Sequence, residues 1–266
     1  MTSFKELTNL SNRTALITGA TGHLGKVFSD TLAELGADLI LVDLSESKLE
    51  KLSSELRKKW DIKVDHFVCN LEIQEERTKL ITKLIDSKVE LNILVNNAAF
   101  TGGSELQGWN VQFDNQSIDT WRRAIEVNLT SIFDLSQGLL PLLRKTQGAN
   151  IINISSIYGL YAPDWQLYED TNLSNPAAYA VSKSGVIGFS RWLSTTISPE
   201  VRVNVIAPGG IFRDQPKDFV DRYCLKVPLG RMATEDDFRG ALAYLASDLS
   251  AYLTGQILVV DGGLGN

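Results

Sequence analysis

The sequence predicts an α/β protein in which seven parallel strands form a doubly wound sheet between two layers of helices. Two patterns in its 266 residues predict this fold class. Short apolar runs alternate with longer segments in which apolar residues recur at the 3.6-residue period of a helix. Most of the short runs are apolar throughout, which is typical of strands covered by helices on both faces.

Six apolar runs predict strands, and residues 64–69 predict a weaker seventh. The six stronger runs are residues 15–17, 39–42, 93–95, 151–154, 201–206 and 257–260.

The segment between the first two strands predicts a helix. Gly36 follows it as a stop signal, so the two strands and the helix form a βαβ unit. The apolar residues that share one helical face are Leu24, Val27, Phe28, Leu32 and Leu35.

A later helix is predicted to begin at Asn175-Pro176, just upstream of Tyr179 and Lys183. Proline is favoured in the first turn of a helix, and the Asn175 side chain is expected to cap it.

Composition and charge exclude several classes of protein. Hydrophobic residues make up 44% of the chain, which is enough for a core, and we expect one domain over residues 1–266. The net charge of −6, without a basic stripe, argues against a nucleic-acid partner. Two cysteines, no signal-peptide pattern and no apolar run of membrane-spanning length predict a cytoplasmic protein without a membrane partner.

A glycine-rich turn, residues 18–25, follows the first predicted strand and opens the first helix of the βαβ unit. Glycines at such a turn let the backbone approach a pyrophosphate, and the helix N-terminus supplies donors to its oxygens. Asp43 ends the second strand, where a carboxylate accepts hydrogen bonds from the adenosine ribose and repels a 2′-phosphate. This Rossmann-type arrangement predicts NAD(H) in preference to NADP(H); otherwise Asp43 is an ordinary turn residue.

Tyr179 and Lys183 lie four residues apart, which places both on one face of the predicted helix. A fixed cation beside a phenol favours the phenolate, so we expect Lys183 to lower the pKa of Tyr179. Tyr179 is then able to exchange a proton with a substrate oxygen. Taken alone, a Tyr and a Lys at this spacing also occur by chance on exposed helices.

These features, with further motifs between about Arg13 and Gly263, resemble the short-chain dehydrogenase/reductase family in its single-domain branch. The motifs are Asn96-Asn97-Ala98-Ala99, Glu126-Val127-Asn128-Leu129, Asn153-Ile154-Ser155-Ser156, Tyr179-Ala180-Val181-Ser182-Lys183, Ala207-Pro208-Gly209-Gly210 and Thr254-Gly255-Gln256 through Asp261-Gly262-Gly263.

The resemblance implies four catalytic residues. Tyr179 is the acid/base, Ser156 holds the reacting oxygen, Lys183 binds the nicotinamide ribose and tunes Tyr179, and Asn128 supports a proton-relay water. No metal is required, and His23 and His66 do not suggest a zinc site. The implied cofactor contacts are Gly19, Thr21, Gly22, His23, Leu24, Gly25, Asp43, Asn70, Leu71, Asn97, Ala98, Tyr179, Lys183, Pro208, Gly209 and Ile211.

The resemblance also bears on assembly and substrate. Members of this branch are usually homotetramers or homodimers, built through helices that correspond here to residues 117–145 and 177–198. A closer similarity, to bacterial oxidoreductases of the flagellin modification protein A type, implies an amino-sugar or other carbohydrate substrate. The residues that carry it are 96–100, 157–159, the inserted segment near 163–175 and 228–234.

Some positions depart from the family pattern. Gly19 and Gly22 are separated by two residues rather than three, and His23 stands where a glycine is expected; this spacing is nearer to the branch of nucleotide-sugar epimerases and dehydratases. Asn70 stands where an Asp commonly contacts the adenine. Arg213 replaces a threonine that usually contacts the cofactor, and it is a candidate for binding an anionic substrate group.

Two segments near residues 100–117 and 163–175 look like insertions that follow strand ends, where active sites form. The first contains Trp109 and the second Trp165, and both also carry carboxylates. Aromatic faces mixed with polar groups suit a sugar or sugar phosphate. Packing of these aromatic residues against the domain or a neighbouring subunit is the alternative explanation.

The predicted function is therefore NAD(H)-dependent hydride transfer at a carbonyl or secondary alcohol of a sugar-like small molecule. An epimerase or dehydratase that retains NAD is one alternative, and a non-catalytic dinucleotide sensor is another. A sensor has no need of the four catalytic residues.

Overall fold

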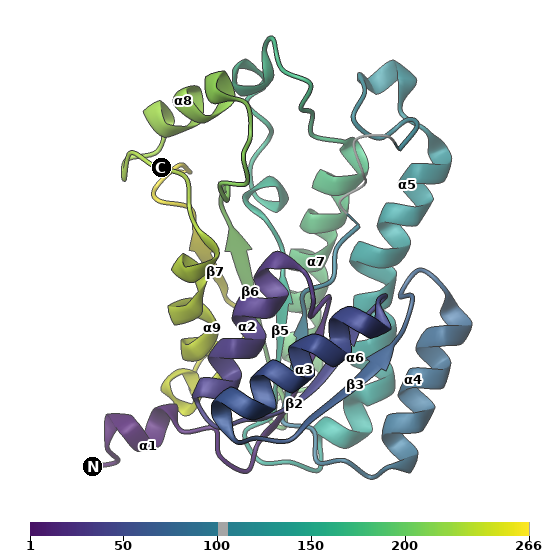
Figure 1. Cartoon of the computed structure of the whole chain (residues 1–266), viewed down its shortest axis with the longest axis vertical. Coiled ribbons are helices and arrows are strands. Elements are labelled where there is room, and N and C mark those ends of the chain that lie inside the picture. Colours follow the sequence, from purple (N-terminus) through teal and green to yellow (C-terminus); the bar gives the residue numbers. More distant parts are fainter. Residues whose placement is uncertain (101–105, 266) are drawn as a thin grey trace.

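The computed structural model describes residues 1–100 and 106–265, so the first insertion is described only at Phe100 and from Leu106 onward. Seven parallel strands form one sheet in the order β3-β2-β1-β4-β5-β6-β7, which confirms the predicted fold class (Figure 1). The strands are β1 (Thr14–Thr18), β2 (Asp38–Asp43), β3 (Val64–Val68), β4 (Ile93–Asn96), β5 (Asn150–Ile154), β6 (Arg202–Pro208) and β7 (Ile257–Val260).

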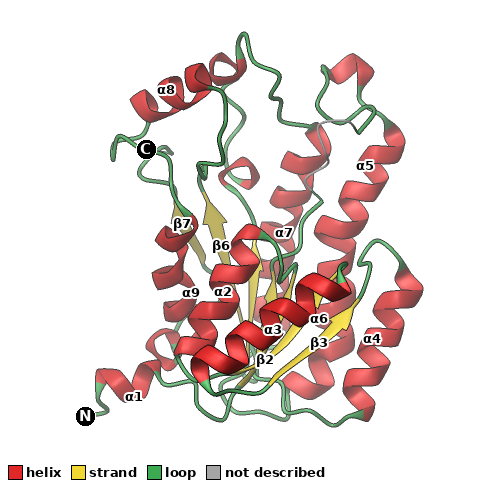
Figure 2. Ribbon diagram, viewed as in Figure 1, coloured by secondary structure: helices red, strands yellow, loops and turns green. Residues whose placement is uncertain are grey.

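Helices cover both faces of the sheet (Figure 2). The helix predicted between the first two strands ends as expected, and Gly36, two residues after its last residue, adopts a φ of +95°. The helices are α1 (Phe4–Thr8), α2 (His23–Glu34), α3 (Glu46–Trp60), α4 (Gln74–Asp86), α5 (Ile118–Ile125), α6 (Ser131–Leu143), α7 (Ala177–Thr196), α8 (Lys217–Lys226) and α9 (Arg239–Ala246).

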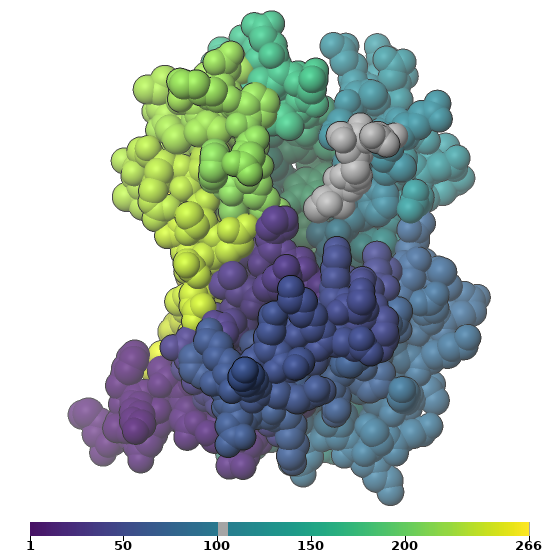
Figure 3. All heavy atoms as spheres, viewed as in Figure 1, coloured from purple at the N-terminus to yellow at the C-terminus, as the bar shows by residue number. Residues whose placement is uncertain are grey.

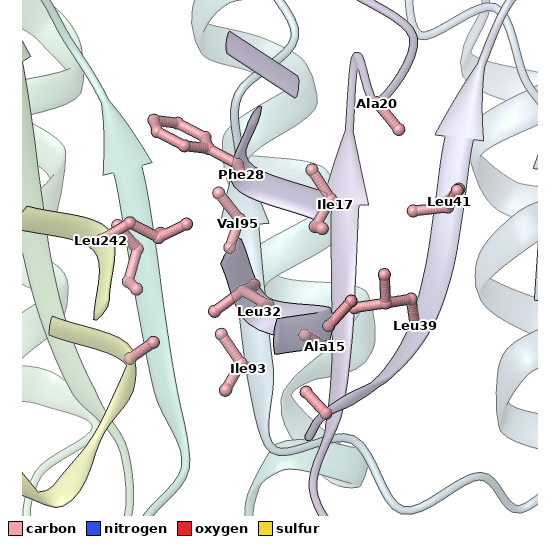
Figure 4. Packing of buried hydrophobic residues seen from close by; sticks show 14 of the residues in the cluster. Ala15, Ile17, Ala20, Phe28, Leu32, Leu39, Leu41, Ile93, Val95 and Leu242 are labelled. Atoms are coloured by element: carbon pink, nitrogen blue, oxygen red, sulfur yellow. The ribbon is translucent and has the colours of Figure 1, made fainter. Parts of the chain in front are cut away.

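The hydrophobic core has two halves, one on each side of the sheet. On one side, α2, α3 and α9 pack against the sheet, and Figure 4 shows Leu32 and Leu242 beside Ile93 and Val95. On the other side, α4, α6 and α7 contribute Leu80, Leu139 and Leu193 among others. Burial on both faces explains why most strands are apolar throughout. The edge strand β3 is the weakest of the predicted strands, and its burial is correspondingly partial.

The start of α7 differs from the expectation. Pro176 is the N-cap, with extended backbone, and the Asn175 side chain forms no cap. Asn175 is instead buried, at 5% exposure, and its Oδ1 has no hydrogen-bond partner in the described part of the chain. Its amide acts to lower the pKa of the Tyr158 and Tyr168 phenols.

Parallel strands place all their carboxyl ends at one edge of the sheet, and the loops after those ends build a common site. The glycine turn follows β1, Asp43 ends β2, Asn97 follows β4, Ser156 follows β5 and Gly209 follows β6.

Candidate active site

A cavity of about 830 Å³ opens at this edge of the sheet. Figure 3 shows the face of the molecule that is hollowed above the purple N-terminal part, between the yellow-green C-terminal part and the teal residues. All sixteen residues predicted to contact the cofactor line the cavity. Ser156 and Arg213 line it as well, whereas Asn128, Trp109 and Trp165 do not.

The glycine turn has the shape that a dinucleotide needs. Gly19 adopts a φ of +64°, and a Cβ there would lie 2.8 Å from the Ala98 Cα. A Cβ on Gly25 would lie 2.0 Å from the Gly19 carbonyl oxygen, so only glycine fits. Asn97 closes the turn, since its Nδ2 donates to the carbonyl oxygens of Thr18 at 2.9 Å and Gly19 at 3.1 Å. These residues fit a nicotinamide dinucleotide, with the α2 N-terminus available to its phosphates.

Asp43 is held in place by the same turn. Its Oδ2 accepts hydrogen bonds from the Thr21 backbone N at 2.7 Å and from Thr21 Oγ1 at 2.8 Å. Its Oδ1 accepts from the Leu44 backbone N at 2.7 Å. A carboxylate oxygen accepts more than one hydrogen bond, so Asp43 retains capacity for ribose hydroxyl groups. Lys48, from the first turn of α3, also lines this part of the cavity.

Tyr179, Ser156 and Lys183 meet at the inner wall of the cavity. Ser156 lies beside the hydroxyl of Tyr179, and its side chain acts to lower the pKa of that phenol. Lys183 lies one turn further along α7, with its Nζ 5.8 Å from the centre of the Tyr179 ring, and donates to the Ile154 carbonyl oxygen at 2.8 Å. The lysine is only 2% exposed. Its burial lowers its pKa to about 8.

The electrostatics differ from the expectation that Lys183 lowers the pKa of Tyr179. Burial raises the pKa of the Tyr179 phenol above its ordinary value, and the hydrogen bond from Ser156 and the charge of Arg213 act in the opposite direction. The cation that favours the phenolate is therefore Arg213, which lies 34 residues beyond Tyr179 in the sequence. Its guanidinium Nε donates to Glu235 Oε1 at 3.1 Å.

Asn128 lies behind this group rather than on the cavity wall. It is fully buried in a π-helical segment, Glu126–Thr130, that joins α5 to α6. Its Oδ1 accepts from the Phe100 backbone N at 2.6 Å, and its Nδ2 donates to Ser182 Oγ at 3.1 Å. Local π-helical turns inside α-helices are frequent at functional sites.

The two tryptophans lie elsewhere than expected. Trp109 is 2% exposed and packs edge-on against Phe100, with ring centroids 5.1 Å apart. Trp165 is 56% exposed and packs beside Tyr168. Neither indole lines the cavity, contrary to the expectation that both face the substrate. The alternative, packing against the domain, describes Trp109, whereas Trp165 is exposed and contacts Tyr168 of its own segment.

The structure adds residues that the sequence reasoning did not assign to the site. Tyr158, Tyr168, Phe219, Tyr223 and Met232 line the cavity beyond Tyr179. Two signals were present in the sequence: Tyr158 follows Ser156 by two residues, and Tyr168 lies in the second insertion.

Within residues 1–100 and 106–265, no helix is both long and apolar enough to cross a membrane. In the same part of the chain, no three His, Cys, Asp or Glu side chains are grouped so that they could hold a metal ion.

Comparisons with known proteins agree with this geometry. A family model described as enoyl-(acyl carrier protein) reductase matches residues 19–265. The chain is 32% identical over 260 residues to the 3-oxoacyl-acyl-carrier-protein reductase FabG of Thermotoga maritima, covering 96% of this chain and 98% of the relative. It is 33% identical over 264 residues to FabG of Rickettsia bellii, with the same coverage.

Two solved structures are similar over nearly their whole length. One is a short-chain dehydrogenase from Leptospira borgpetersenii with bound NAD+, at 28% identity and a TM-score of 0.84, covering 100% of this chain and 97% of that one. The other is a gluconate 5-dehydrogenase from Burkholderia cenocepacia in complex with NADP and tartrate, at 27% identity, a TM-score of 0.86 and 98% coverage of both chains. The glycine turn, the Ser156-Tyr179-Lys183 group and these matches together establish that the chain belongs to the short-chain dehydrogenase/reductase family and is an oxidoreductase.

Proposed function

We propose that the protein, acting as a single catalytic domain, transfers a hydride between NAD(H) and a carbonyl or secondary alcohol of a small, polar, carbohydrate-like substrate. The observation that carries the proposal is that Tyr179, Ser156 and Lys183 line the same cavity as the glycine turn. When bound, the nicotinamide cofactor supplies or accepts the hydride.

The chain itself binds the reacting oxygen and moves the proton. Ser156 and Tyr179 present two hydroxyl groups to a single carbonyl oxygen. Because burial raises the pKa of Tyr179, the phenol is protonated near neutral pH and donates its proton to that oxygen during reduction. Arg213 and Ser156 then stabilise the phenolate, and in the reverse direction the phenolate accepts the proton. Lys183 holds the nicotinamide ribose, and Asn128 supports the water through which Tyr179 is reprotonated.

The preference for NAD(H) rests on Asp43. A fixed carboxylate at the end of β2 accepts from ribose hydroxyl groups and repels a 2′-phosphate. The similar structures include one with NAD+ and one with NADP, so the family accommodates both cofactors. Lys48, which also lines the cavity, is a cation that favours a 2′-phosphate. The ratio of NADH-dependent to NADPH-dependent activity will show whether Asp43 or Lys48 has the larger effect.

The polar substrate is supported by the cavity wall beyond Tyr179. Arg213 supplies a guanidinium there, and Tyr158, Tyr168 and Tyr223 line the same cavity. A guanidinium binds a carboxylate or phosphate group. The similar gluconate 5-dehydrogenase is named for a polyhydroxylated acid and was solved with tartrate. The second candidate, favoured by the sequence relatives, is reduction of a 3-oxoacyl thioester.

The test measures NADH and NADPH oxidation with 5-ketogluconate, ketose phosphates, nucleotide-linked keto sugars and acetoacetyl-CoA. We expect NADH-dependent turnover of a polyhydroxylated substrate with kcat/KM at least ten-fold above that of acetoacetyl-CoA. Preference for the thioester would replace the carbohydrate proposal with the second candidate. Tight NADH binding without turnover on any substrate would contradict both.

We also propose that the protein is a homotetramer or homodimer through the helices α5–α6 and α7. Phe133, Phe189 and Trp192 form a row of aromatic side chains on α6 and α7, with ring centroids 5.8 and 6.5 Å apart. Phe133 and Trp192 are 44% and 60% exposed. A clustered aromatic surface of this kind is typical of a protein interface.

A further inference from the structure

Two tyrosine hydroxyl groups face each other at the substrate end of the cavity. Tyr158 and Tyr168 line the cavity, and their hydroxyl oxygens lie 2.5 Å apart. Tyr158 lies near the reacting group, because its backbone N is hydrogen-bonded to the Ser156 hydroxyl. The pair therefore lies close enough to the reacting group to touch the same small substrate.

Tyr158 is positioned by the turn that presents Ser156. It lies in the short 3-10 helix Ile157–Gly159, and its backbone N donates to Ser156 Oγ at 3.2 Å. A change in the position of Ser156 therefore moves Tyr158 with it.

Tyr168 is positioned by packing of the second insertion against α8. It ends the 3-10 helix Trp165–Tyr168, and its ring packs against Phe219 with centroids 5.5 Å apart. Leu167 forms a small separate core with Phe219 and Tyr223 of α8 and with Val227 and Met232 of the following loop. An ion pair between Asp164 and Lys226 ties the same two segments together.

The hydrogen bonds of this cluster are incomplete. The two hydroxyl groups carry two protons, and their mutual bond uses only one. Asn175 is buried, its amide acts to lower the pKa of both phenols, and its Oδ1 has no hydrogen-bond partner among the described residues. A buried polar atom without a partner is unfavourable, because it has lost its hydrogen bonds to water. Asn175 does not line the cavity, so the group that a ligand meets there is the unused phenol proton, and a ligand hydroxyl group accepts it.

We propose that Tyr158 and Tyr168, held by the Ser156 turn and by packing against α8, form a specificity subsite that binds a non-reacting hydroxyl group of the substrate. The inference rests on the proposed function, since it assigns which residues recognise the polyhydroxylated part of that substrate. An acyl chain beyond the reacting carbonyl has no hydroxyl group to bind at the two tyrosines, so the unused phenol proton would remain without an acceptor.

The test compares two keto acids that differ in their hydroxyl groups, 5-ketogluconate and 5-oxohexanoate. Both carry a carboxylate and a ketone at the same separation, and only the first carries hydroxyl groups between them. NADH oxidation with each is measured for the wild type, Tyr158→Phe and Tyr168→Phe. Tyr161→Phe is the matched control, because this tyrosine is on the same loop, is 42% exposed and does not line the cavity.

We expect the ratio of kcat/KM for 5-ketogluconate to that for 5-oxohexanoate to fall about ten-fold in each cavity variant, the effect of one lost hydrogen bond. The Tyr161→Phe ratio should equal that of the wild type. Equal losses on both substrates, or a displaced pH profile, would overturn the subsite, because they indicate a structural or proton-transfer role. If the wild type prefers 5-oxohexanoate, the carbohydrate proposal itself is overturned. If the wild type prefers 5-ketogluconate but the ratio is unchanged in the variants, only the subsite is overturned.

Discussion

Replacing Lys183 with Met should stabilise the protein while removing its activity. The lysine is 2% exposed, and burial lowers its pKa from the ordinary 10.5 to about 8. The difference between these values corresponds to roughly 3 kcal/mol, which is the cost of keeping the ammonium charged in the folded protein at pH 7. The hydrogen bond to the Ile154 carbonyl oxygen, worth about 1 kcal/mol, is lost in the variant. The net gain is therefore roughly 2 kcal/mol.

The direction in which the stability difference changes with pH follows from proton binding at Lys183. Between pH 8 and 10.5 the folded protein binds fewer protons at Lys183 than the unfolded chain does. Wild-type stability therefore rises with pH across this window relative to the variant, which carries no titrating group there. The advantage of Lys183→Met should be largest at pH 7 and should shrink as the pH approaches 10.

Urea unfolding of the cofactor-free protein, followed by circular dichroism at pH 7.0 and 9.5, measures the difference at each pH. Both proteins are used at one concentration, because assembly and bound cofactor stabilise the native state. Lys145→Met serves as the control, since Lys145 is exposed and should change little. A variant less stable than the wild type at pH 7, with a gap that does not depend on pH, would refute the reasoning.

Four further variants test other parts of the site and the assembly. Tyr179→Phe should bind NADH, by fluorescence titration, as the wild type does but lose at least a thousand-fold in kcat, because no acid remains at the reacting oxygen; near-normal kcat would remove Tyr179 from the mechanism. Asp43→Ala should lower the ratio of kcat/KM with NADH to kcat/KM with NADPH about ten-fold, and an unchanged ratio would show that the carboxylate does not select the ribose. Gly25→Ala should lower the unfolding free energy by about 3 kcal/mol, since the new Cβ would lie 2.0 Å from the Gly19 carbonyl oxygen, and a normal urea midpoint would contradict this. Trp192→Glu should dissociate the oligomer in analytical ultracentrifugation; an unchanged mass would move the interface elsewhere.

The sequence predicted the sheet and the cofactor side of the cavity because both depend on local signals. Runs of apolar residues specify strands buried on both faces, and all seven predicted strands are present. The glycine turn is equally local, since Gly19 and Gly25 are required by the backbone around them. Parallel strands then bring Asp43, Asn97 and Gly209 to one edge without further information.

The substrate side could not be predicted in the same way. Trp109 and Trp165 look alike in the sequence, yet one is buried in a cluster with Phe100 and the other is exposed beside Tyr168. Whether an aromatic residue in a loop faces a cavity depends on what that loop packs against. For the second insertion the partner is α8, about fifty residues away in the chain.

The sequence alone determined the order of strands and helices, the dinucleotide turn and the identity of the Tyr179-Lys183 pair, because periodicity, glycine chemistry and helical spacing act over a few residues. Only the tertiary structure decided the charge environment of that pair. Burial lowers the pKa of Lys183 and raises that of Tyr179, and Arg213, thirty-four residues beyond Tyr179, is the cation that favours the phenolate. Desolvation and long-range charge depend on how distant segments pack together, which no local pattern encodes.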